Sequence, residues 1–189
     1  MLSNPNLQGV VAIYDPYRQY LAGQSGQIVH DYSGRNRSGV LGATDSVATD
    51  DPTWTSTSFV LDGVDDFINI PTSPLIPVSS LLEMTLCICF KRGQNGAFEC
   101  LFSKGVLGVP NSYVLYFRNS NPYLRFNLND GAEKVLNYTG NDLLTNKYYF
   151  LSMSIKNGEQ KIYINGVLSA EASLSISAID NTVINMTRF

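Results

Sequence analysis

The chain has 189 residues, of which 44% are hydrophobic and 15% are charged, and its formal net charge is −3. This composition is typical of a globular protein, because disordered chains combine low hydrophobicity with high net charge. A net negative charge disfavours the extended positive surface that drives binding to nucleic acid, so we expect no nucleic-acid partner.

The sequence shows neither a basic segment followed by an apolar stretch near the N-terminus nor an apolar run long enough to cross a membrane. We therefore expect a chain that is made in a cytoplasm, without a secretory leader and without a membrane partner. Its three cysteines, Cys87, Cys89 and Cys100, are an odd number, so we predict reduced, buried thiols. The lone histidine, His30, leaves no tetrahedral zinc set, and we expect no metal or other cofactor.

The first sixty residues are irregular and rich in Gly, Ser, Asp and Tyr. We predict a short N-terminal arm over residues 1–9 and one domain over residues 10–189, since all-β sandwiches often reach about 200 residues as single units. Val10–Tyr14 has the composition of a strand. Phe59–Leu61 and Phe67–Ile70 are predicted to form a hairpin that turns through the aspartates of residues 62–66.

In the rest of the chain, apolar and polar side chains alternate in several segments, which predicts strands. After a one-turn helix predicted over Ser79–Glu83, the segment Thr85–Phe90 places Leu86, Ile88 and Phe90 on one face, which is the period of a strand. The same pattern predicts strands over Glu99–Ser103, Tyr113–Arg118, Tyr123–Leu128, Lys134–Tyr138, Tyr148–Ile155 and Gln160–Ile164. Hairpin turns are predicted at Asn129–Gly131, Asn157–Gly158 and Asn165–Gly166. Because no helix is long enough for a parallel crossover, the sheets must be antiparallel.

Several motifs follow one another in a specific order. The turn over Asp31–Gly39, with the sequence DYSGRNRSG, precedes Phe59–Ile68, with the sequence FVLDGVDDFI. Leu101–Gly105, Tyr148–Phe150 and Ile162–Val167 come after them. In this order the motifs resemble the laminin-G-like branch of the concanavalin A-like family. The resemblance implies an all-β fold in which two antiparallel sheets pack as a jelly-roll sandwich.

The chain departs from that family at its end. The family continues beyond the region of Asn185–Arg188 with strands that pair beside the N-terminal strand, whereas this chain stops at Phe189. We therefore expect an unpaired sheet edge near Val10–Tyr14, covered by another chain in a homo-oligomer or by another particle protein. Leu2–Leu7 or the segment Tyr14–Tyr20, interpreted as unstructured, would reach across.

Catalytic residues are not predicted. Glycoside hydrolases of this fold need two carboxylates on one strand face, often two residues apart. No glutamate of the chain has an acidic neighbour at that spacing; the glutamates are Glu83, Glu99, Glu133, Glu159 and Glu171. His30, beside Asp31, is interpreted as a loop histidine and not as the base of a nucleophilic triad. We therefore predict that the protein is not an enzyme.

Two groups of residues leave a choice between binding and structure. Asp62, Asp65 and Asp66 crowd oxygen donors as calcium sites do, but aspartates also stabilise tight turns, and we favour the turn and predict no metal site. Four aromatic residues could stack on sugar rings, namely Tyr17, Tyr20, Trp54 and Tyr123. Because tyrosines on a β-sandwich are usually half-buried, we favour a core or interface role and leave the ligand-binding residues unassigned.

The resemblance narrows function only by analogy, because this fold serves lectins, glycan hydrolases, adhesive modules and virion proteins. Our first hypothesis is a non-enzymatic structural protein of a phage virion, because such proteins are made in the host cytoplasm without a leader. It would be a capsid decoration, head-fibre or tail-surface subunit that assembles with other virion proteins and contacts host glycans. The alternative is a stand-alone bacterial carbohydrate-binding module. A glycan-active enzyme is disfavoured by the missing carboxylate pair.

Overall fold

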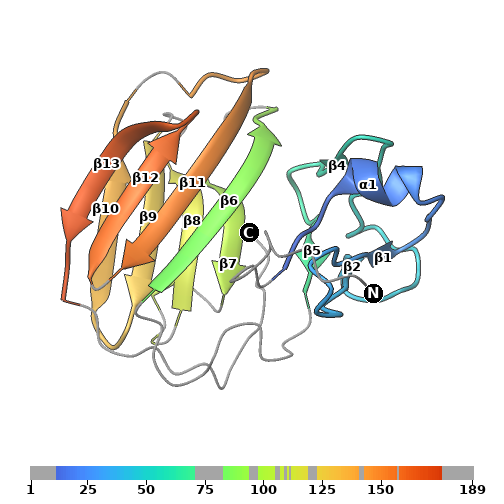
Figure 1. The fold of residues 1–189 in the computed structure, drawn as a ribbon, viewed down its shortest axis with the longest axis horizontal. Coiled ribbons are helices and arrows are strands. Elements are labelled where there is room, and N and C mark those ends of the chain that lie inside the picture. The colour runs from blue at the N-terminus through green and yellow to red at the C-terminus, as the bar shows by residue number, and fades with distance from the viewer. Residues whose placement is uncertain are drawn as a thin grey trace. The chain divides into compact units, whose positions relative to one another are not determined.

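The computed structural model describes residues 12–70, 83–93, 98–104, 107–108, 110, 112–118, 123–140, 143–156 and 158–175. The chain forms two compact units, an N-terminal unit over residues 1–76 and a C-terminal unit over residues 77–187 (Figure 1). Residues 1–9, predicted as an arm, lie outside the described residues, and the single domain over residues 10–189 stays a prediction. No helix in the described part of the chain has the length and hydropathy needed to cross a membrane.

The described residues of the C-terminal unit form two four-stranded antiparallel sheets. Their strand orders are β10-β9-β8-β7 and β13-β12-β11-β6, and Figure 1 shows them as two layers. The strands are β6 (Glu83–Lys91), β7 (Phe98–Lys104), β8 (Ser112–Arg118), β9 (Tyr123–Asn129), β10 (Glu133–Tyr138), β11 (Tyr148–Lys156), β12 (Glu159–Ile164) and β13 (Val167–Ser173). Phe90 of β6 lies between the layers, 5.8 Å from the ring centroid of Phe117 on β8. The predicted all-β sandwich of antiparallel sheets is confirmed.

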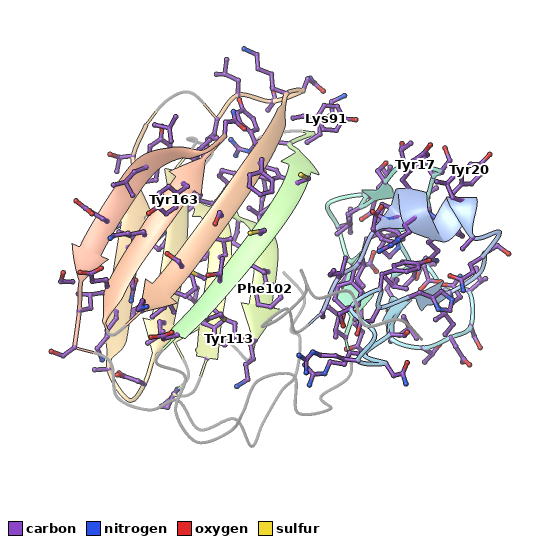
Figure 2. The ribbon with its side chains drawn as sticks, viewed as in Figure 1. Tyr17, Tyr20, Lys91, Phe102, Tyr113 and Tyr163 are labelled. Carbon is purple, nitrogen blue, oxygen red and sulfur yellow. The ribbon has the colours of Figure 1, made fainter. Side chains whose placement is uncertain are left out.

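As predicted, side chains along the strands of the sandwich alternate between its surface and its core, and the inward-facing side chains pack together. Along β6, exposed and half-buried residues alternate without exception. Phe102 stacks on Tyr113 with centroids 5.8 Å apart, and Tyr113 is 2% exposed (Figure 2). Buried apolar side chains from β8, β9, β11 and β12 complete the core, and they include Leu115, Phe117, Leu124, Phe126, Leu128, Leu151, Met153 and Ile162. Burying each such side chain contributes about 1.5–3 kcal/mol, so this core is the main source of stability of the unit.

The cysteines differ from the prediction. Cys87 and Cys89 are exposed, because they occupy the outward-facing positions of β6. Cys100 is half-buried, and burial raises the pKa of its thiol to about 11. The prediction of buried thiols is therefore wrong for Cys87 and Cys89, where the strand period outweighs the usual preference of cysteine for the interior.

An ion pair between the buried Arg92, which follows β6, and the half-buried Glu99 joins the end of β6 to β7. The guanidinium of Arg92, which is 3% exposed, donates to both carboxylate oxygens of Glu99 at 2.8 and 2.9 Å. The same guanidinium lies 4.4 Å from the ring centroid of Phe117 and donates to the carbonyl of Leu143 at 3.4 Å. Glu99 thus neutralises a buried cation, which is a structural task.

The turns of the C-terminal unit agree with the sequence in three places. Gly131 has φ 110° between β9 and β10, in the turn predicted over Asn129–Gly131. Asn165 and Gly166 both have positive φ, 51° and 82°, and join β12 to β13 as a tight turn requires. Gly158 has φ 86° between β11 and β12, whereas Asn157 lies outside the described residues. The helix predicted over Ser79–Glu83 is wrong at its last residue, because Glu83 pairs with Lys156 as the first residue of β6. Its other residues are outside the described part.

Residues 12–70, the described part of the N-terminal unit, form one helix, a three-stranded sheet and a two-stranded sheet. The helix is α1 (Pro16–Leu21). The three-stranded sheet has the order β1-β2-β5, and the strands are β1 (Ile28–Val29), β2 (Gly39–Leu41) and β5 (Ile68–Asn69). The two-stranded sheet pairs β3 (Thr53–Trp54) with β4 (Phe59–Val60). The predicted hairpin between Phe59–Leu61 and Phe67–Ile70 is therefore wrong, because the aspartate turn leads from one sheet to the other.

Two further predictions fail at the start of this unit. Within Val10–Tyr14, residues 10 and 11 are not described, and the rest forms no strand apart from a bridge between Tyr14 and Asp31. The segment Tyr14–Tyr20 is not unstructured, because it contains α1. Asp15 caps the helix by accepting from the amides of Tyr17 and Arg18 at 3.0 and 3.1 Å, and Pro16 begins it.

Candidate functional site

A solvent-open groove of about 410 Å³ lies in the N-terminal unit. One side of the groove is formed by residues at and just after the end of α1, and the other by residues at and just after the end of β3. Its lining residues are Tyr20, Gly23, Gln24, Ser25, Trp54, Thr55 and Ser56. The volume falls within the range of roughly 300–1,000 Å³ that small-molecule sites occupy.

The position of Tyr20 is set by its buried neighbour Gln19. The Gln19 side chain is 1% exposed, donates to the carbonyl of Ile28 at 2.7 Å and accepts from the amide of His30 at 3.0 Å. These two bonds fix α1 against β1. Tyr20 is 55% exposed, and Figure 2 shows Tyr17 and Tyr20 both projecting from α1.

The residues directly after α1 line the groove on the same side as Tyr20. Gly23 has φ 68°, and its amide donates to the carbonyl of Tyr20 at 2.9 Å, so the chain turns sharply after the helix. The hydroxyl of Tyr32 donates to the side-chain oxygen of Gln24 at 2.8 Å. This bond orients the Gln24 amide group, whose nitrogen has two donor hydrogens.

The hairpin of β3 and β4 supplies the opposite side. Trp54 pairs with Phe59, and the turn between them is closed by the amide of Thr55 donating to the carbonyl of Ser58 at 2.8 Å. The Thr55 hydroxyl also accepts from the amide of Ser58 at 3.0 Å. Thr55 and Ser56, in this short turn, line the groove together with Trp54.

The indole of Trp54 is oriented with its polar edge inward. Trp54 is half-buried, but its Nε1 is shielded from solvent and has no hydrogen-bond partner among the described residues. The exposed part of the ring is therefore carbon. The groove thus combines two aromatic surfaces with hydroxyl and amide groups, and none of its lining side chains is charged.

Of the four aromatic residues singled out from the sequence, the structure brings two together. Tyr20 and Trp54 line the groove, whereas Tyr17, although 51% exposed, does not. The side chain of Tyr123 lies outside the described part. At 55% exposure Tyr20 is not a core residue, and its role at an interface stays a prediction. Sequence reasoning missed the polar residues of the groove, because Gln24, Ser25, Thr55 and Ser56 match no motif.

The carboxylates of Asp62, Asp65 and Asp66 lie within 4.8 Å of one another. Asp62 accepts from the amide of Val64 at 2.7 Å, and its own amide donates to Asp66 at 2.7 Å, so the predicted turn role is confirmed. Burial, and then the charges of the neighbouring aspartates, raise the pKa of Asp66. Three carboxylates could supply part of the six to eight oxygens that calcium takes. The absence of a metal site stays a prediction.

Asp31 does not serve His30 as a triad partner would. Its carboxylate accepts from the amides of Ile13, Ser33 and Arg37 at 3.0, 2.8 and 3.0 Å, and from the Ser33 hydroxyl at 2.8 Å. Burial by itself would raise the pKa of Asp31, but these hydrogen bonds outweigh it and hold the pKa below its usual value. Asp31, the first residue of the DYSGRNRSG turn, stabilises that turn through these bonds.

A family profile for laminin-G-like domains, described as the concanavalin A-like lectin/glucanases superfamily, matches residues 62–186. This match spans more than half of the chain. The chain belongs to the concanavalin A-like lectin/glucanases superfamily. The superfamily match covers the aspartate turn and strands β6 to β13, whereas the groove residues precede it. No curated protein sequence matches the chain.

Three solved structures are similar to the chain at low sequence identity. Botulinum neurotoxin type C, whose cell entry is described as dependent upon interaction with two ganglioside molecules, is 17% identical with a TM-score of 0.53, over 94% of this chain and 41% of the toxin chain. A Bacteroides ovatus protein described as carbohydrate-binding is 17% identical with a TM-score of 0.42, over 66% and 40%. Mouse laminin alpha1 domains LG4-5 are 15% identical with a TM-score of 0.41, over 56% and 28%. The chain thus spans less than half of each, and only the toxin bears on the fold.

Proposed function

We propose that this chain is a non-enzymatic carbohydrate-binding protein and that the groove between Tyr20 and Trp54 is its binding surface. The observation that carries the proposal is the pairing of exposed indole carbon with a tyrosine ring in one groove. A sugar ring has a C–H face, which packs on aromatic carbon, and hydroxyl groups, which need donors and acceptors. Gln24, Ser25, Thr55 and Ser56 supply those groups.

The superfamily contains both lectins and glucanases by its description, and we place this chain on the lectin side. No acidic side chain lines the groove. In the C-terminal unit, Glu99 is bound at both oxygens by Arg92, so it is poorly suited to transfer protons. The aspartates of the turn at residues 62–66 bond their own backbone. These features support binding without turnover.

The experiment compares three single substitutions by glycan-array binding and calorimetry. Tyr20→Ala and Trp54→Ala should each weaken glycan binding about tenfold or more, because each removes one aromatic surface. Tyr17→Ala is the matched control, since Tyr17 is an exposed tyrosine of the same helix outside the groove lining. Equal binding by the Tyr20→Ala and Tyr17→Ala proteins, both folded, would refute the groove as the site.

We also propose that this binding serves a phage particle, on which the chain is a capsid decoration, head-fibre or tail-surface subunit in a homo-oligomer. Two exposed thiols, Cys87 and Cys89, support synthesis in a reducing host cytoplasm, where such thiols stay unpaired. Mass spectrometry of purified particles tests the location, and analytical ultracentrifugation tests the oligomer. A monomer that binds sugar and is absent from particles would favour the bacterial carbohydrate-binding module.

A further inference from the structure

We infer that the groove selects neutral glycans and discriminates against acidic ones, such as sialylated or sulfated oligosaccharides. The inference rests on the proposed function and adds the substrate class. It follows from two independent observations, the uncharged lining of the groove and the uneven distribution of charge along the chain.

The first observation is local. The side chains that line the groove are aromatic, hydroxyl or amide groups, and none of them is a cation. A carboxylate or sulfate that entered the groove would lose water and gain no opposite charge. Desolvating an anion without a partner is costly, whereas a sugar hydroxyl is satisfied by an amide or a hydroxyl group.

The second observation concerns the whole N-terminal unit. Residues 1–76 contain three arginines and eight aspartates, with no lysine or glutamate, a formal net charge of −5. Residues 77–189 contain ten basic and eight acidic residues, a formal net charge of +2. The groove therefore lies on the acidic part of the chain, and the field there repels anionic ligands.

Arg18 is the cation nearest to the groove in sequence, two residues before Tyr20. Its guanidinium lies 5.3 Å from the ring centroid of Tyr32, the residue whose hydroxyl orients Gln24. Arg18 is thus placed over an aromatic ring, and it is not part of the groove lining. We expect it to hold Tyr32 and Gln24 in position and not to recruit an anion.

The test is binding of the full-length chain to an array of neutral oligosaccharides, each matched with its sialylated and its sulfated derivative. At low ionic strength, each neutral oligosaccharide should bind more tightly than its acidic derivatives, by about tenfold or more. The preference should shrink as salt is added, because surface charges are screened over about 8 Å at physiological ionic strength. Acidic members that bind as well as or better than neutral ones would overturn the inference and leave the proposed function standing. If no member binds, both fail.

Two substitutions sharpen the result. Asp15→Asn removes one negative charge from α1, and asparagine is an equally good helix cap. It should improve binding of acidic members about twofold at low salt and leave neutral members unchanged. Arg18→Gln should not weaken acidic members selectively. If it does, Arg18 recruits the anion and the inference is wrong.

Discussion

At the scale of single residues, the carboxylate of Asp31 accepts four hydrogen bonds in the turn over Asp31–Gly39 and its surroundings. It binds three backbone amides and one hydroxyl, which come from residues before and after it in the sequence. An asparagine has one acceptor oxygen in its place, and its NH₂ group would face donors. Asp31→Asn should therefore lower the free energy of unfolding by about 1–3 kcal/mol at pH 7, measured by denaturant unfolding.

The pH dependence of this loss has a definite sign. The pKa of Asp31 is lowered in the folded protein from its usual value of 3.8, so its contribution is present above pH 3.8 and is lost as the pH falls through the folded pKa. The difference between the parent and Asp31→Asn should narrow in that acidic range. Asp45→Asn, at an exposed aspartate of the same unit, is the control and should change stability little. A difference that stays constant from pH 7 to pH 3 would contradict this account.

At the scale of elements, the strands of the C-terminal unit could be predicted from the sequence, and the small elements of the N-terminal unit could not. β6 and β11 are nine residues long, enough for several alternations to appear. β1, β3, β4 and β5 have two residues each, and two residues show no period. The pairing of β1 and β5 with β2 also depends on contacts between residues that are about 10 to 30 positions apart in sequence.

Unlike the two-residue strands of the N-terminal unit, the helix α1 does have a signal in the sequence. Asp15 followed by Pro16 is a helix cap followed by a favoured first residue. The helix is only six residues long, which is too short to show a helical period in the sequence. The groove could be predicted only in part for a related reason. As aromatic residues, Tyr20 and Trp54 are candidates from the sequence alone, but their positions in the groove depend on the hydrogen bonds of Gln19 and on the β3–β4 turn.

The corrected pairing of β5 with β2 can be tested at Gly39. A Cβ on Gly39 would lie 2.6 Å from the carbonyl oxygen of Asn69, which is part of β5. Gly39→Ala should therefore separate these two strands and lower stability by about 1–3 kcal/mol, measured by thermal unfolding. Gly93→Ala is the control, because no atom lies within 4 Å of its added Cβ. An unchanged melting temperature for Gly39→Ala would mean that β5 does not pair there.

At the scale of the whole molecule, the two units are stabilised in different ways. Of the 18 buried apolar side chains in the described residues, only Val29 and Leu41 belong to the N-terminal unit. That unit depends instead on polar residues such as Gln19, Asp31 and Asp50, whose side chains bond the backbone. A hydrogen bond contributes about 1 kcal/mol net, less than a buried Leu or Phe, so the N-terminal unit should open more readily than the sandwich.

Hydrogen exchange in the native state can measure this difference and tie it to function. Backbone amides of β1, β2 and α1 should exchange faster than those of β8, β9 and β11, because local opening follows local stability. A neutral glycan at 100 times its dissociation constant stabilises the state that binds it by about 2.7 kcal/mol. If the groove is the site, protection should increase in residues 12–70 and stay unchanged in the core strands of the sandwich. Protection that rises in β8, β9 and β11 instead would place the glycan on the C-terminal unit, and the assignment of Tyr20 and Trp54 would be wrong.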